Sequence, residues 1–122
     1  MARKIIVIDD DKITRTMLTE MLSRNGYETF PAHDGAEGLA LVYQERPELV
    51  LTDLLIPVVD GIGVCCRIKD NPILRGTKVI VMSALKNLVL SREARDAGAD
   101  EFLEKPIKMD ALLELLRRLV PD

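Results

Sequence analysis

Short apolar segments alternate with amphipathic segments along the whole chain. The segments KIIVI and KVIVMS are almost continuously apolar and rich in β-branched residues, which is typical of strands covered on both faces. With these two, five segments are predicted to be strands: residues 4–8, 27–31, 48–52, 78–83 and 101–105. The segments that follow them are predicted to be helices, most with apolar residues three and four positions apart: residues 12–24, 35–45, 61–70, 87–97 and 108–120.

Four of the predicted helices have one apolar side, which is expected to face the core. The residues on these sides are Met17, Leu18, Met21 and Leu22; Ala36, Leu39, Ala40 and Tyr43; Leu90, Ala94 and Ala97; and Leu112, Leu113, Leu116, Leu119 and Val120. Aromatic residues make up only 3% of the chain, so the core is expected to be aliphatic.

Strict alternation of strands and helices predicts an α/β fold, with a parallel sheet covered by helices on both faces. The 122 residues suit one domain, residues 1–122. A closed eight-stranded barrel would need about twice this length, so an open, doubly wound sheet is expected. In such sheets, ligands bind beyond the carboxyl ends of the strands.

Composition narrows the classes of function. A net charge of −3 argues against a nucleic-acid-binding surface, because phosphate contacts need a basic face. The two cysteines are adjacent, which excludes a disulfide framework and fits a reducing compartment. The single histidine, His33, lies in a predicted turn and is interpreted as solvent-exposed. No apolar stretch approaches the ~18 residues that span a bilayer, and no signal peptide is recognised, so a cytoplasmic protein is expected.

Chemically reactive side chains follow four of the predicted strands. They are Asp9, Asp10 and Asp11 after the first strand, Asp53 after the third, Ser83 at the end of the fourth and Lys105 at the end of the fifth. Because parallel strands end at one edge, these groups are expected to share a shallow pocket. Crowded carboxylates repel each other unless a cation is present, and oxygen ligands suit Mg²⁺ better than zinc.

The same set of groups suits phosphoryl transfer, which depends on positioning and charge neutralisation. Lys105 and Ser83 could meet phosphoryl oxygens, and Asp53 stands apart as the expected nucleophile. Each residue also has a simpler structural interpretation, and for Asp11 that interpretation, a helix N-cap, is preferred. Four strand ends carrying such groups at one edge favour the functional interpretation for the others.

These residues and their surroundings resemble the receiver domain of two-component response regulators. The motifs are VIDDD, DLLIPVVDG, VIVMSA and EFLEKP, and the resemblance covers essentially the whole chain. It implies a flavodoxin-like, CheY-like sheet of five strands in the order 2-1-3-4-5. Two departures are mild: Ile56 stands where methionine is common before the proline, and Ser83 replaces the commoner threonine.

The resemblance also implies a role for each site residue. Asp53 would be the phospho-acceptor and a metal ligand, with Asp10 binding Mg²⁺ directly and Asp9 through water. Leu55 would contribute its backbone carbonyl to the metal. Ser83 and Lys105 would contact the phosphoryl group. In addition, Phe102 would move inward with the switch, and the Lys105–Pro106 bond would be cis.

The resemblance implies a signalling role and no conventional enzyme activity beyond Mg²⁺-assisted self-phosphorylation and slow autodephosphorylation. The phosphoryl group would come from a sensor histidine kinase or a histidine phosphotransfer protein. A downstream effector or output domain would read the surface of residues 87–120, without direct nucleic-acid or membrane binding. A stand-alone receiver and a piece of a longer regulator both fit the sequence.

Two further expectations concern apolar residues near the site. Leu55 and Leu85 lie two positions after Asp53 and Ser83, so they are expected at the pocket rim, where they would hinder hydrolysis. Simple packing of these leucines is an equally plain alternative. The stretch LKNLVL, residues 85–90, has more apolar residues than one buried side needs, which favours a partner or homodimer face on the fourth helix over scattered exposure.

Two other protein families offer alternative functions. Haloacid-dehalogenase-like phosphatases carry a D-x-D pattern after the first strand, which Asp9 and Asp11 match. That family needs another acidic group after its lysine, and the stretch KPIKMD offers only Asp110, within the last helix; Asp53 would have no role. A flavin-binding domain would need a phosphate loop rich in glycine and hydroxyl residues after the first strand, and the sequence lacks one.

Overall fold

The computed structural model describes residues 2–85 and 88–121, and within them it has five strands and five helices in strict alternation. The strands are β1 (Lys4–Ile8), β2 (Glu28–Ala32), β3 (Leu49–Asp53), β4 (Lys78–Ser83) and β5 (Glu101–Glu104). The helices are α1 (Lys12–Arg24), α2 (Gly35–Glu45), α3 (Gly61–Lys69), α4 (Leu88–Asp96) and α5 (Met109–Leu119). Every predicted boundary within the described residues agrees to within one residue, and the predicted first residue of the fourth helix, 87, lies outside them.

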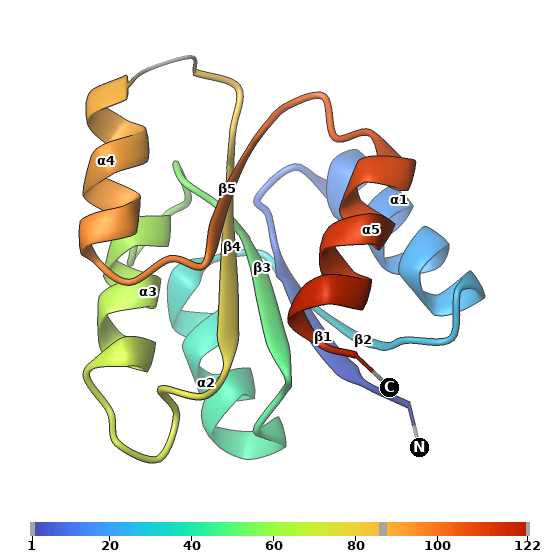
Figure 1. Ribbon diagram of the computed structural model, residues 1–122, viewed down its shortest axis with the longest axis horizontal. Coiled ribbons are helices and arrows are strands. Elements are labelled where there is room, and N and C mark those ends of the chain that lie inside the picture. Colours follow the sequence, from blue (N-terminus) through green and yellow to red (C-terminus); the bar gives the residue numbers. More distant parts are fainter. Residues whose placement is uncertain (1, 86–87, 122) are drawn as a thin grey trace.

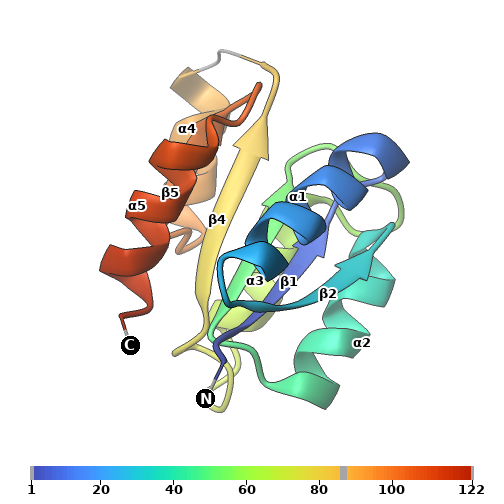
Figure 2. The same ribbon diagram turned by 90° about the vertical axis from the view of Figure 1, so that its right-hand side faces the viewer.

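The strands form one parallel sheet in the order β2-β1-β3-β4-β5 (Figures 1 and 2). The predicted doubly wound fold and its strand order are therefore confirmed. Helices α2, α3 and α4 cover one face of the sheet, and α1 and α5 cover the other (Figure 1). Among the described residues, no helix is both long and apolar enough to cross a membrane.

Two hydrophobic clusters fill the space between the sheet and its helices. Ile6 and Ile8 of β1 point into the cluster under α2, α3 and α4, whereas Ile5 and Val7 point into the cluster under α1 and α5. Side chains of a strand alternate between its faces, so a strand buried on both sides needs apolar residues at every position. This explains the continuous apolar run that ends at the acidic residues.

The predicted buried side of α2 is wrong in all but one position. Leu39 is buried as expected, but Ala36 and Ala40 are exposed and the Tyr43 side chain is 50% exposed. The helix approaches the sheet through glycine: a Cβ placed on Gly38 would lie 2.2 Å from Cδ1 of Ile8. This close approach rotates α2 so that Gly35, Gly38, Leu39 and Val42 face inward.

The buried side of α1 is narrower than predicted. Leu18 and Leu22 are fully buried, whereas Met17 is 47% exposed. The helix packs against β2 and β1 near the edge of the sheet, so only a thin stripe of it meets the core. By contrast, Leu112 and Leu116 of α5 are fully buried, as predicted.

The loop between β3 and α3 holds a strained residue. Val58 has φ of +72° and is 77% exposed, and Val59 N–H donates to the Pro57 carbonyl at 2.9 Å across it. This pattern is a γ-turn with a positive central φ, a conformation that is costly for a β-branched residue.

Replacing Val58 by glycine is therefore expected to raise the free energy of unfolding by about 1 kcal/mol, because the strain that is relieved exceeds the entropy cost of glycine. Thermal and urea unfolding of Val58→Gly would measure the gain. The matched control is Ile73→Gly, because Ile73 is also exposed, at 68%, and has no positive φ. The control is expected to lose stability, and a loss of equal size in Val58→Gly would contradict the strain interpretation.

Candidate functional site

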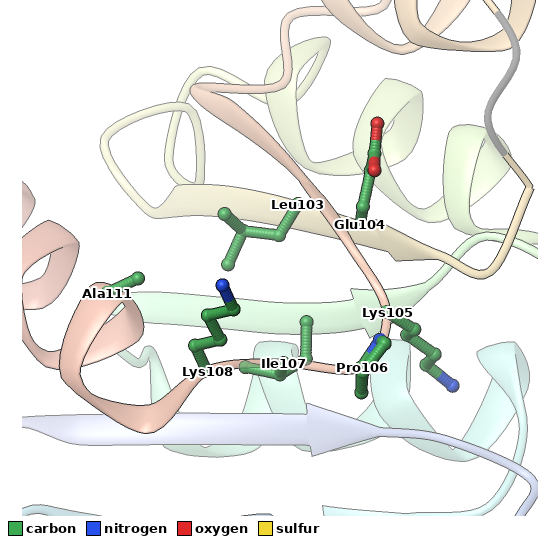
Figure 3. A pocket seen from close by; sticks show the side chains of 7 residues that line it. All are labelled: Leu103, Glu104, Lys105, Pro106, Ile107, Lys108 and Ala111. Atoms are coloured by element: carbon green, nitrogen blue, oxygen red, sulfur yellow. The ribbon is translucent and has the colours of Figure 1, made fainter.

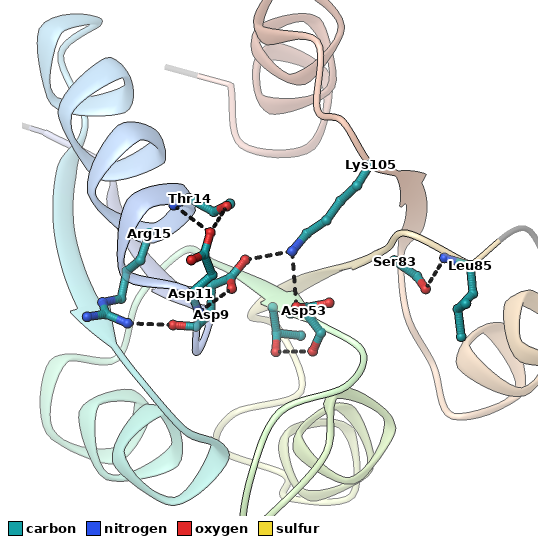
Figure 4. Close-up of polar contacts among 9 residues, drawn as sticks. Asp9, Asp11, Thr14, Arg15, Asp53, Ser83, Leu85 and Lys105 are labelled. Atoms are coloured by element: carbon teal, nitrogen blue, oxygen red, sulfur yellow. Dashed lines mark hydrogen bonds and ion pairs between the residues drawn. The ribbon is translucent and has the colours of Figure 1, made fainter.

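The carboxyl ends of β1, β3 and β5 bring three charged side chains into direct contact (Figure 4). Asp9 follows β1 directly, Asp53 is the last residue of β3, and Lys105 follows β5. The Lys105 ammonium lies 2.9 Å from Oδ2 of Asp9 and 3.0 Å from Oδ2 of Asp53. The structure thus joins residues that are far apart in the sequence, at the sheet edge where the strand ends predicted a pocket.

Asp9 is fully buried, and both of its carboxylate oxygens are hydrogen-bonded. Oδ1 accepts the N–H of Asp11 at 2.9 Å, while Oδ2 accepts from Lys105. Asp11 in turn caps helix α1, because its Oδ2 accepts the N–H of Thr14 at 3.1 Å. The contacts with the Thr14 hydroxyl and N–H lower the pKa of Asp11, so it is ionised in its predicted capping role.

Three carboxylates are close enough to share a cation. Asp9, Asp10 and Asp53 each offer an oxygen, and these oxygens all lie within 4.8 Å of one another. Asp10 is exposed and Asp53 is partly buried, so the cluster opens toward solvent on one side. An all-oxygen donor set with an open side fits Mg²⁺, which binds one or two carboxylates and keeps several waters. The set lacks the histidine and cysteine that zinc prefers.

The charges of the site do not balance, because one ammonium faces three carboxylates. Burial is the main influence on Asp53, and it raises the pKa of this carboxyl above its ordinary value despite the Lys105 hydrogen bond. Burial works against a charged ammonium as well, but the hydrogen bonds that Lys105 donates to Asp9 and Asp53 outweigh it and raise the pKa of Lys105. A divalent cation would remove the excess negative charge and favour the ionised form of Asp53.

The structure places Ser83 at the same sheet edge but turns its hydroxyl elsewhere. Ser83 is the last residue of β4 and is buried, and its Oγ accepts the N–H of Leu85 at 3.0 Å. The Lys105 N–H donates to the Ser83 backbone carbonyl at 2.8 Å, but within the described part of the chain no hydrogen bond joins the Ser83 hydroxyl to Asp53 or Lys105. Phe102 of β5 packs partly buried against the cluster under α2, α3 and α4. A role for either residue in a switch requires it to move.

Leu55 and Leu85 are 62% and 46% exposed, and each lies on a loop at the carboxyl edge of the sheet.

The prediction that His33 is a surface residue is confirmed: its ring is 61% exposed and contacts Asp34 and Glu37 at the start of α2. The predicted cis bond between Lys105 and Pro106 is present.

Two residues of the site were not found from the sequence. The Thr52 hydroxyl, buried in β3, donates to the carbonyl of Asp53 at 2.9 Å. The Arg15 guanidinium donates to the carbonyl of Asp9 at 2.7 Å (Figure 4). A threonine within an apolar strand and an arginine in the first turn of a helix were signals that could have pointed to them.

A hollow of about 320 Å³ beside Lys105 is separate from the acidic cluster. It is lined mainly by apolar groups of β5, α5 and their connection, and the Lys105 ammonium points away from it (Figure 3). Its lining residues are Leu103, Glu104, Lys105, Pro106, Ile107, Lys108 and Ala111. The chemistry of the site therefore lies on the other side of the β5–α5 connection.

The geometry disfavours the phosphatase alternative. That reading makes Asp9 the nucleophile, but Asp9 is fully buried and both carboxylate oxygens are engaged. Its partner Asp11 is used as a helix cap. Of the two carboxylates in contact with Lys105, Asp53 is the more accessible, at 14% exposure against 0% for Asp9.

Comparison with known proteins agrees with this arrangement. Residues 5–117 match the model of the response regulator receiver domain family. The chain is 36% identical over 121 residues to sporulation initiation phosphotransferase F of Bacillus subtilis, covering 99% of this chain and 96% of that protein. It is 37% identical over 130 residues to response regulator MprA of Mycobacterium tuberculosis, covering 100% of this chain.

This chain spans about half the length of MprA, 54%. Among solved structures, the chemotaxis response regulator CheY4 of Vibrio cholerae has a TM-score of 0.91 and 26% sequence identity. That alignment covers 98% of this chain and all of CheY4. Sequence and structure comparisons therefore point to the same group of signalling proteins.

Proposed function

The chain belongs to the response regulator receiver domains of two-component systems, and from this premise we propose that Asp53 accepts a phosphoryl group from a phosphohistidine. The donor would be a sensor histidine kinase or a histidine phosphotransfer protein in the cytoplasm. The contact of Asp53 with Lys105, at 3.0 Å within a cluster of carboxylates, is the observation that carries this proposal.

In the proposed reaction, a carboxylate oxygen of Asp53 attacks the phosphorus atom of the donor. The P–N bond to the imidazole breaks as the P–O bond forms, so the products are an acyl phosphate and a free histidine. Mg²⁺ held by Asp10, Asp53 and the Leu55 carbonyl, with Asp9 acting through water, would supply charge neutralisation at the phosphoryl oxygens. Lys105 contacts Asp53 at 3.0 Å and would donate to the transferred group, which this contact supports.

The new phosphoryl oxygens would then bias the molecule between two arrangements. Ser83 would exchange its bond with the Leu85 N–H for one with the phosphoryl group, and Phe102 would turn inward. The signal would be read from the surface of α4, β5 and α5 by a downstream effector or output domain.

A homodimer through α4 is a further proposal. Leu88 and Val89 are 85% and 64% exposed there. Of the predicted stretch 85–90, residues 86 and 87 lie outside the described residues.

Phosphorylation with a small donor tests the proposed function directly. The chain would be incubated with acetyl phosphate, once with Mg²⁺ and once with excess EDTA, and its intact mass measured. One added phosphoryl group that requires Mg²⁺ is the expected result. Repeated release of phosphate from a small phosphoester such as p-nitrophenyl phosphate would instead identify a phosphatase.

The lifetime of the phosphorylated form is expected to depend on Leu55 and Leu85. Their exposed apolar side chains, two positions after Asp53 and Ser83, would hinder the water that hydrolyses the acyl phosphate. Replacing either leucine by asparagine is expected to speed the loss of the phosphoryl group several-fold, on the order of 1 kcal/mol of barrier. Loss would be followed by intact mass after the donor is removed.

A control for this measurement is Ile73→Asn, since Ile73 is similarly exposed, at 68%, but lies in the loop before β4, away from the carboxyl edge. Its phosphoryl lifetime is expected to equal that of the parent. If the leucine variants also kept the parent lifetime, these side chains would serve packing alone.

A further inference from the structure

Arg15 occupies a place that helix stability does not explain. It lies in the first turn of α1, after the Asp11 cap, and no acidic residue lies in that turn. The amino end of a helix carries partial positive charge, so a cation there is unfavourable for the helix itself. The guanidinium turns back toward the β1–α1 loop and donates to the Asp9 carbonyl at 2.7 Å (Figure 4).

This hydrogen bond holds the whole peptide group between Asp9 and Asp10, and not only the carbonyl oxygen of Asp9. The carbonyl of Asp9 and the N–H of Asp10 belong to the same planar peptide unit. Holding that carbonyl therefore sets the direction in which the chain continues into Asp10. Asp10 is exposed, so its own surroundings constrain its carboxylate much less than those of Asp9.

The other polar groups of Asp9 have different partners. Its N–H donates to the Ala32 carbonyl at 3.1 Å, and its carboxylate is shared between Asp11 N–H and Lys105. Lys105 would contact the phosphoryl group in the proposed reaction, whereas the hydrogen bond of Arg15 is to the backbone carbonyl of Asp9. Arg15 can thus hold the loop both before and after phosphorylation.

We propose that Arg15 is a positioning residue for the metal site: by holding the Asp9 carbonyl, it orients Asp10 to bind a divalent cation. This inference rests on the proposed Mg²⁺ site. Outer contacts that orient metal ligands commonly change metal affinity by 10- to 100-fold when they are removed. Arg15 itself would touch neither the cation nor the phosphoryl group.

If Arg15 acted through its charge alone, its removal would change the Mg²⁺ affinity in the opposite direction. Arg15 is a cation near a cation-binding site, so removing its charge should strengthen Mg²⁺ binding if charge were its only contribution. Loss of positioning should weaken binding. The sign of the change in affinity therefore separates the two effects.

The experiment is isothermal titration of Mg²⁺ into the full chain at neutral pH and constant ionic strength, for the parent and the Arg15→Met variant. Methionine keeps an unbranched apolar stem but removes both charge and donor. Binding about tenfold weaker than in the parent is expected. Lys12→Met is the matched control, because it removes one cation from the same helix turn, and it is expected to bind Mg²⁺ equally or up to about twofold more tightly.

A conservative variant and a folding measurement complete the design. Arg15→Lys keeps the charge and a donor, so its affinity is expected to lie between those of the parent and Arg15→Met. Circular dichroism melting in EDTA establishes that each variant is folded at the titration temperature. If Arg15→Met were unfolded there, the comparison of Arg15→Lys with the parent would decide, with weaker binding supporting the proposal and equal binding overturning it.

Two results would overturn the inference and differ in meaning. Arg15→Met binding Mg²⁺ as tightly as the parent, or more tightly, would show that Arg15 acts through charge or packing alone. A parent chain that binds no Mg²⁺ would overturn the proposed metal site and the role of Arg15 with it. The acetyl phosphate experiment would show separately whether the phosphorylation proposal survives.

Discussion

Replacing Asp53 by asparagine is expected to abolish phosphorylation by acetyl phosphate and Mg²⁺. The amide has nearly the same size but lacks the nucleophilic carboxylate that would form the acyl phosphate. Intact-mass measurement should therefore show one added phosphoryl group on the parent chain and none on Asp53→Asn.

The matched control for this change is Asp11→Asn. It makes the same chemical substitution close to the site, and asparagine caps a helix about as well as aspartate. The control should still be phosphorylated. A phosphoryl group found on Asp53→Asn would place the acceptor elsewhere and would reopen the phosphatase interpretation.

The Asp53→Asn variant should also differ from the parent in how its stability depends on pH. Burial raises the pKa of Asp53 above the ordinary value of 3.8, so the folded state binds its proton more tightly than the unfolded state does. This carboxyl therefore makes stability fall as pH rises from below 3.8 through its raised pKa. In EDTA, Asp53→Asn should be more stable than the parent at neutral pH, and the difference should vanish in acid.

Replacing Lys105 by methionine is expected to lower the free energy of unfolding by about 2–3 kcal/mol when Mg²⁺ is absent. Methionine keeps most of the apolar stem, so the loss comes from the charge. The fully buried Asp9 would lose its ammonium partner and would face Asp53 without it. The loss is smaller than for a fully buried ion pair, because the Lys105 side chain is 20% exposed and Asp9 still accepts the N–H of Asp11.

Added cations should reverse much of this loss. In urea unfolding, the gap between Lys105→Met and the parent should narrow at saturating Mg²⁺, since the metal supplies the missing positive charge. The control is Lys108→Met, three residues further on, where the side chain is exposed and makes no helix-capping bond. That variant is expected to stay within about 0.5 kcal/mol of the parent, and an equally stable Lys105→Met would show that the ion pairs contribute little.

The sequence was informative wherever a local pattern has one structural solution. Continuous apolar strands alternating with helices require a parallel sheet covered on both faces, and parallel strands end at one edge. That is why the sequence predicts that Asp9, Asp53 and Lys105 lie together. The cap on α1 was equally local, because an aspartate three residues before a helical N–H satisfies it directly.

Other features depended on contacts between elements, which sequence patterns do not encode. The inward side of α2 is decided by glycines that allow close approach to Ile8 and Val59, and a hydrophobic pattern gives glycine no weight. The orientation of the Ser83 hydroxyl depends on the course of the loop after β4.

The sequence by itself therefore determined the fold, the strand order through its family resemblance, and the acidic edge. Only the tertiary structure showed that Arg15 reaches the Asp9 carbonyl, and that Asp9 is sealed inside while Asp10 stays in solvent. The physical reason is the range of the contacts: hydrophobic periodicity and helix capping involve residues close together in the sequence, whereas a guanidinium finds its acceptor, and a carboxylate becomes buried, only after helix and strand have packed.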